Sequence, residues 1–176
     1  MLPDTNSPFD ASVQSGPILD LELISEHARI NGSVNLGAYS RLSDLLSFHD
    51  EVLAISDARI LTEGGAETGD RAATLDVHLD SLTLVIDRSD YVPPPDTEQA
   101  IEKKPHRMLA ATEGHLITAT FFIYPDAEPI PYLRAAVPKW IPLANVEVRS
   151  LIDPTAKVTS EFAVLRRASV TATAII

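Results

Sequence analysis

The sequence predicts an all-β protein of two tandem small β-barrel or bent-sheet units, each of about five strands with one short helical turn. Apolar and polar residues alternate in several short segments, which is the period of a strand. Each half of the chain also contains one short helical segment with its own start signal, Ser40 in the first half and Pro129 in the second. The same order of segments recurs 88 residues later, and two such periods account for the 176 residues. This recurrence predicts an internal duplication.

Four segments follow from this period. Residues 1–16 are polar and aperiodic and predict a disordered N-terminal arm, with Phe9 as a possible docking point. Residues 17–88 form the first β-repeat and residues 105–176 the second. Residues 89–104 form a proline-rich linker, whose run of three prolines favours a polyproline II spacer.

In the first repeat, residues 18–24 and 28–36 alternate between apolar and polar side chains and predict two half-buried antiparallel strands. Residues 52–60 predict a third strand with less regular alternation. Residues 62–73 contain three glycines and predict a polar loop. Two short strands over residues 74–80 and 81–87 are expected to close the unit.

A helical turn is predicted from Leu42 to Phe48, with Ser40 as its N-cap. Leu42, Leu45 and Leu46 share one face, and a seven-residue helix needs that face to pack on the sheet. Arg41 and Asp44 are spaced to pair with each other or to cap neighbouring backbone. Arg41, Asp44, Leu45 and its counterpart Leu133 are therefore assigned to a structural turn.

The second repeat places its segments in the same order, with Pro129 as the first residue of its helical turn. Residues 121–124 are wholly apolar, which predicts a strand buried on both faces, at a contact between units. Phe121, Phe122 and Trp140, together with Phe9, are the predicted interface residues.

Composition excludes several classes of protein. The chain contains no cysteine, so disulfides, thiol catalysis and cysteine metal sites are excluded. No signal peptide is recognised and no apolar run approaches the roughly 20 residues that span a bilayer, so a cytoplasmic protein without membrane insertion is expected. The net charge of −11 disfavours nucleic acid and anionic membranes as partners.

Charge is divided unequally between the repeats. Residues 17–88 carry 13 acidic and 5 basic side chains, a net charge of −8, whereas residues 105–176 carry 6 acidic and 7 basic, a net charge of +1. This difference suits a contact between the first repeat of one chain and the second repeat of the next. Divergence of solvated faces after duplication is the alternative explanation.

No phosphate loop, dinucleotide fingerprint or nucleophile elbow occurs, and the histidines lack the spacing of a helical metal pair. Asp76, His78 and Asp80 alternate on one strand face and are the nearest approach to a catalytic cluster. An exposed polar face of a sheet explains them better. No catalytic, cofactor-binding or metal-binding residue is therefore assigned, and no cofactor is expected.

The turn over residues 41–47, RLSDLLS, followed by the strand VLAISDARI, resembles an uncharacterised bacterial family with the motif R-L-S-D-x-L-N. Ser47 stands in place of the expected asparagine, and the second repeat matches only in pattern. The resemblance covers residues 18–87 and implies a small β-domain without an assigned activity. The order of elements is also similar to Sm-like small barrels, which assemble into rings and often bind RNA.

These observations predict a non-enzymatic structural or assembly protein that forms a homo-oligomer or docks onto a larger protein complex. A small-ligand sensor with a cleft between the repeats is one alternative. An Sm-like RNA-binding protein is another, against which the acidic charge argues.

Overall fold

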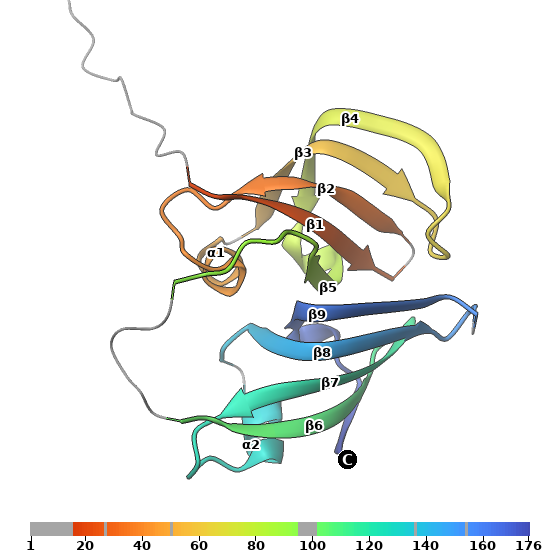
Figure 1. The fold of residues 1–176 in the computed structure, drawn as a ribbon. Coiled ribbons are helices and arrows are strands. Elements are labelled where there is room, and N and C mark those ends of the chain that lie inside the picture. Colours follow the sequence, from red (N-terminus) through yellow and green to blue (C-terminus); the bar gives the residue numbers. More distant parts are fainter. Residues whose placement is uncertain (1–15, 27, 50, 95–101, 136, 154) are drawn as a thin grey trace, which may run out of the picture.

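The computed structural model describes residues 16–26, 28–49, 51–94, 102–135, 137–153 and 155–176. The described chain is all-β: ten strands form one open antiparallel sheet, accompanied by two short α-helices (Figure 1). The predicted arm up to residue 15, including Phe9, lies outside the described residues. So do His27 and the central part of the predicted linker.

The described part of the first half contains five strands, one α-helix and one 3-10 turn. In order they are β1 (Ile18–Ser25), β2 (Arg29–Asn35), α1 (Leu42–Phe48), β3 (Val52–Leu61), β4 (Glu67–His78), a 3-10 turn (Leu79–Ser81) and β5 (Leu82–Asp87). The second half repeats this order. Its elements are β6 (Lys104–Ala111), β7 (His115–Ile123), α2 (Pro129–Arg134), β8 (Trp140–Ser150), β9 (Lys157–Arg166), a 3-10 turn (Arg167–Ser169) and β10 (Ala172–Ile175).

The strand order across the sheet is β10-β6-β7-β8-β9-β5-β1-β2-β3-β4. Each half therefore contributes five neighbouring strands in an equivalent order, and the halves meet where β5 pairs with β9 (Figure 1). The prediction of two tandem barrels is not confirmed, because the ten strands form one continuous sheet that does not close. The linker's last predicted residue, Lys104, is the first residue of β6.

The strand registers of the two halves correspond. Val52 pairs with His78, and Trp140 pairs with Arg166, each 88 residues later. The ladder between β1 and β2 recurs with a shift of 87 in both strands, since Ile18 pairs with Asn35 and Pro105 with Phe122. The prediction of a gap-free repeat is therefore wrong by one residue, which the second half inserts between β7 and β8.

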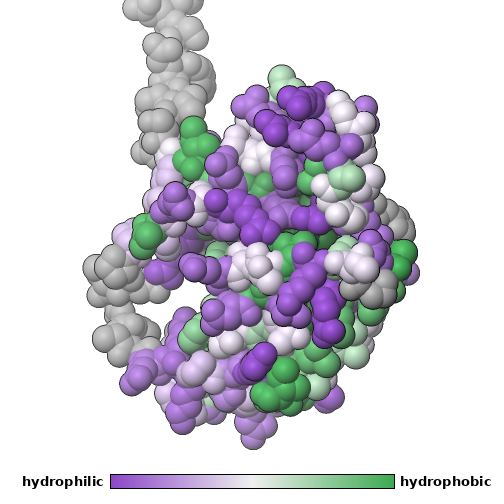
Figure 2. Space-filling model, turned by 45° about the vertical axis from the view of Figure 1, so that its right-hand side comes forward, coloured by the Kyte–Doolittle hydropathy of each residue, from purple (hydrophilic) through white to green (hydrophobic). Residues whose placement is uncertain are grey.

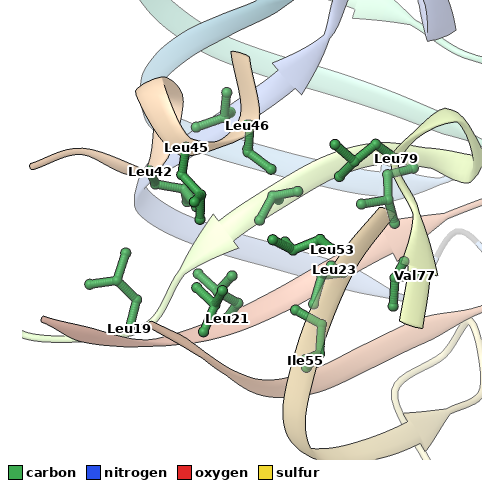
Figure 3. Packing of buried hydrophobic residues seen from close by; sticks show 14 of the residues in the cluster. Leu19, Leu21, Leu23, Leu42, Leu45, Leu46, Leu53, Ile55, Val77 and Leu79 are labelled. Atoms are coloured by element: carbon green, nitrogen blue, oxygen red, sulfur yellow. The ribbon is translucent and has the colours of Figure 1, made fainter. Parts of the chain in front are cut away.

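Helix α1 has the predicted bounds and packing. Leu42, Leu45 and Leu46 are all buried, and Figure 3 shows them pointing from α1 toward the leucines of the strands. The predicted N-cap is wrong by one residue: Arg41 occupies that position and makes no side-chain cap bond. Pro129 begins α2 as predicted, and Leu133 is buried like Leu45.

Two other sequence predictions need correction. Most of the predicted loop over residues 62–73 is strand, because β4 begins at Glu67 and the connection is a tight turn with Gly65 at φ +86°. The apolar run over residues 121–124 is not buried on both faces. Phe121 and Ile123 point into the core, whereas Phe122 and Tyr124 are exposed. Ordinary strand alternation thus outweighs the apolar composition of this run.

Candidate functional site

The pairing of β5 with β9 is the feature that joins the halves. Leu84 pairs with Leu165 and Val85 with Val164. All four side chains have no solvent exposure. Val85 and Val164 belong to the hydrophobic cluster of the first half, and Leu84 and Leu165 to that of the second. The two faces of this strand pair therefore serve different cores.

Each half also completes the core of the other. Trp140 begins β8, yet it is buried in the cluster of the first half, and α1 lies against β8. Reciprocally, Ile24 of β1 is buried in the cluster of the second half. Because burial of a large side chain is worth about 1.5–3 kcal/mol, these exchanged residues make the halves interdependent.

A buried carboxylate reinforces the junction from the polar side. Glu22 is only 4% exposed and accepts hydrogen bonds from Arg29 and Arg88. The Arg88 bonds come from Nε at 3.0 Å and Nη2 at 2.7 Å. Arg88 Nη1 also donates to the carbonyl oxygen of Thr159 on β9, at 2.8 Å. Arg88 therefore connects β1 with the second half.

A second cluster of polar side chains lies between the β3–β4 turn, the start of β7 and the end of β8. The Ser150 hydroxyl donates to Glu63 and accepts backbone N–H bonds from Ile152 at 3.1 Å and Asp153 at 3.0 Å. His115 pairs with Ser150 across the strands and is buried. The Ser150 hydroxyl thus connects the β3–β4 turn of the first half to the end of β8 in the second.

The environment of His115 favours its neutral form. Burial lowers the pKa of His115, nearby Glu63 opposes this by raising it, and Arg29 lowers it further. The Nδ1 atom of His115 is buried without a hydrogen-bond partner in the described chain. Protonation of this imidazole would therefore place a poorly solvated charge where the two halves meet.

The strands at the two ends of the sheet are β4 and β10. Most side chains of β4 are exposed, including Asp70, Thr74 and Asp76. On β10, Ile175 is 38% exposed, and the following Ile176 is 59% exposed. An edge strand presents unpaired backbone N–H and C=O groups and can pair with another chain unless it is covered.

A groove of about 1220 Å³ runs between the halves and the start of the linker. Its walls combine cationic and aromatic side chains from both halves and from the linker, among them Arg41, Arg88, Lys103, Tyr91, Phe122 and Tyr132. In Figure 2, hydrophilic side chains predominate over the upper, first half, and more apolar ones lie toward the lower right.

The predicted turn residues lie in the two helices or, for Arg41, at the N-cap of α1. Leu45 is a buried residue of α1 and Leu133 a buried residue of α2, and Asp44 lies in the first turn of α1. Arg41 Nη2 donates to the carbonyl oxygen of Pro94 at 3.3 Å, which connects the turn to the linker.

Three of the predicted interface residues lie in the described part of the chain, and their side chains differ in exposure to solvent. Phe121 is buried and stacks on Tyr132 with ring centroids 5.9 Å apart, and Trp140 is buried at the junction. Phe122 is 46% exposed and lines the groove. Within the described residues, Phe122 is thus the member of this set that a partner could contact directly.

Asp76, His78 and Asp80 do not form a row on one strand face. Asp76 and His78 lie on β4, whereas Asp80 lies in the following 3-10 turn and pairs with Arg166 at 3.0 Å. Among the described residues, no group of three or more acidic or histidine side chains could hold a metal ion. No helix in the described chain is long and apolar enough to cross a membrane.

Sequence reasoning missed Glu22, Arg88 and Ser150. Alternation places Glu22 on the polar face of β1, and nothing local distinguishes it from Asp20, which is exposed. The partners of Glu22 come from β2 and from the residue after β5, so only the paired strands bring them together.

Comparison with known proteins finds no matching family model, no matching curated protein and no matching solved structure.

Proposed function

We propose that this chain is a non-enzymatic structural protein that assembles with copies of itself through the two edge strands of its sheet. The observation that carries the proposal is the β5–β9 pairing. Inside one chain, two similar five-strand halves are joined through these strands, and the corresponding strands, β10 and β4, form the outer edges. Strand β10 of one chain could therefore pair with β4 of an identical chain, as β5 pairs with β9 inside one chain. Such a head-to-tail contact is a heterologous association.

The charge distribution supports this direction of assembly. The first half carries a net charge of −8 and ends the sheet at β4, whereas the second carries +1 and ends it at β10. Contact between unlike halves is therefore electrostatically favoured over contact between two first halves. We also propose that each half is a bent sheet similar to the ring-forming small barrels and that the protein is cytoplasmic. RNA binding is not part of the proposal, because the net charge of −11 opposes it.

Native mass tests the proposal. Light scattering coupled to size exclusion, over a hundredfold range of protein concentration, is expected to show a mass above the 19.1 kDa of one chain and rising with concentration. A single-chain mass throughout this range would refute self-assembly.

The groove supports a second candidate, a small-ligand sensor. Its volume of about 1220 Å³ and its walls from both halves suit a ligand whose binding alters their contact. A ligand panel screened by thermal shift is expected to reveal a compound that raises the melting temperature. The effect should disappear in Phe122→Ala, and its persistence there would place the ligand elsewhere.

A further inference from the structure

The groove between the halves is larger than the pocket that a drug-sized ligand usually occupies. Its volume is about 1220 Å³, whereas such pockets measure about 300–1,000 Å³. Its walls contain aromatic rings, prolines, hydroxyl groups and side chains of both charges, from both halves and from the start of the linker. A ligand that suits these walls combines apolar surface, hydrogen-bonding groups and charge. A short peptide offers all three along an extended shape.

The wall formed by the start of the linker is held in place by hydrogen bonds. Asp87 Oδ1 accepts one bond from the N–H of Ser89, at 2.9 Å, and another from its hydroxyl, at 2.5 Å. Tyr91 packs against the hydrophobic cluster of the first half, and its hydroxyl donates to the carbonyl oxygen of Ser40 at 3.2 Å. Asp90 lies between these two anchored residues, and it is exposed. Its carboxylate therefore belongs to a wall that is formed before a ligand binds.

A second wall comes from the strands of the second half. On β9, the Ser160 hydroxyl donates to the carbonyl oxygen of Phe162 at 2.8 Å and accepts a bond from the N–H of Phe162 at 3.3 Å. Glu161 lies between these two residues, lines the groove and is exposed. The rings of Phe162, which is half-buried, and of Phe122 on β7, which is exposed, line the groove as well. This wall thus adds a second carboxylate and two aromatic rings.

The charge that the groove leaves for a ligand is negative. Each cationic side chain in its walls already has a partner within the chain: Arg41 the carbonyl oxygen of Pro94, Arg88 the carboxylate of Glu22, and Lys103 the ring of Tyr124. Among the carboxylates, Glu147 is paired with Lys157 at 2.7 Å. Asp90 and Glu161, by contrast, form no ion pair with any described residue. A basic group on the ligand would supply the counterion that these two carboxylates lack.

We propose that the groove binds a short, extended basic peptide, whose arginine or lysine side chains pair with Asp90 and Glu161. Apolar residues of the peptide then lie against Phe122 and Phe162. A guanidinium or ammonium group also gains from contact with an aromatic ring. Prolines between the basic residues favour binding, because they hold the peptide extended in advance. This inference rests on the second candidate function, ligand binding in the groove, and names the chemical class of the ligand.

A pair of synthetic peptides tests the proposal. The first probe is the fluorescently labelled heptapeptide RPLPRPL with blocked termini, and the second is EPLPEPL, in which glutamate replaces both arginines. Fluorescence anisotropy, with protein up to about 1 mM, is expected to show saturable binding of the basic peptide and at least roughly tenfold weaker binding of the acidic one. The basic peptide should also raise the melting temperature. Equal affinity for the two peptides would overturn the charge argument and with it the proposal.

Matched variants locate the binding. Asp90→Asn and Glu161→Gln are each expected to weaken binding of the basic peptide about two- to fivefold, and the double variant about tenfold, the range of exposed ion pairs. Asp70→Asn removes the same charge from β4 outside the groove and should leave the affinity unchanged. Phe122→Ala should weaken binding about tenfold. Phe48→Ala removes another exposed ring outside the groove and should not. Circular dichroism confirms that each variant is folded.

The outcomes separate this inference from the candidate function on which it rests. If a compound of the ligand panel raises the melting temperature through Phe122 but the basic peptide does not bind, the peptide class is wrong and the sensor stands. If no compound and neither peptide binds, both are overturned. If the basic peptide binds but Asp90→Asn and Glu161→Gln weaken it no more than Asp70→Asn does, the acidic chain as a whole attracts it. The assignment to the groove is then wrong.

Discussion

The buried Glu22 offers the sharpest test of how the halves are held together. Replacing Arg88 with methionine retains much of its apolar stem but removes the bonds at 3.0 and 2.7 Å to Glu22 and the bond at 2.8 Å to Thr159. Hydrogen bonds to charged groups contribute about 1.5–3 kcal/mol each. The Arg88 side chain is 38% exposed, so solvent reduces this contribution.

We therefore expect Arg88→Met to lower the free energy of unfolding by about 2–3 kcal/mol, leaving Glu22 with Arg29 as its remaining cationic partner among the described residues. Urea unfolding followed by circular dichroism measures this as a shift of the midpoint of about 1 M, for a slope near 2 kcal/mol per M. Glu22→Gln, which removes the buried charge, should make the Arg88→Met substitution less costly. A loss below about 0.5 kcal/mol, or additive effects in the double variant, would show that Glu22 does not depend on Arg88.

Three further predictions concern the buried Trp140, the pH dependence of stability and the close packing of β3 against Gly32. Trp140→Ala should cost about 3–5 kcal/mol and lower the stability of both halves in a single transition by circular dichroism, because Trp140 is 3% exposed in the first half's cluster. Separate transitions for the halves would contradict this. Burial lowers the pKa of His115 below the 6.5 that is ordinary for histidine, so the folded protein binds fewer protons than the unfolded chain below that pH. The contribution of His115 to stability is thus full above pH 6.5 and falls as the pH drops toward the folded-state pKa. His115→Gln should flatten this fall in pH-dependent urea titrations, and the exposed His78→Gln should not. Gly32→Ala should destabilise by more than about 2 kcal/mol, because a Cβ there would lie 2.4 Å from the Ile55 side chain and 2.7 Å from the Ser56 carbonyl oxygen. Gly64→Ala is the control, since its nearest contact would be at 3.8 Å.

Local pattern predicted the strands and helices well. The leucine spacing of α1 and the proline that starts α2 are local signals, and the structure retains both. The loop prediction failed where β4 continues through Gly69, which has φ +90°. Glycine and polar residues are typical of loops, yet pairing with β3 holds this exposed segment in the sheet.

The junction could not be predicted, because its determinants are distant in sequence. Val85 and Val164 each look like one apolar residue among several in a strand. That they pair depends on how the two halves lie together. The same holds for Trp140, which the sequence assigned only to an interface of unspecified location and which is buried in the first half's cluster. The charge difference between the halves, by contrast, can be read from the sequence. In the structure the acidic half ends the sheet at β4 and the nearly neutral half ends it at β10.

The β5–β9 pairing also affects the order of events when the chain is made. Strand β5 ends at Asp87, but its partner in β9 is not complete until Arg166. At a synthesis rate of about 5–20 residues per second, the first half exists for several seconds before β9 can cover β5. During this interval a doubly apolar strand is open on one side, and the first-half cluster lacks Trp140. Newly made first halves are therefore the stage at which this protein is most exposed to misassociation, and a chaperone that shields β5 would act there.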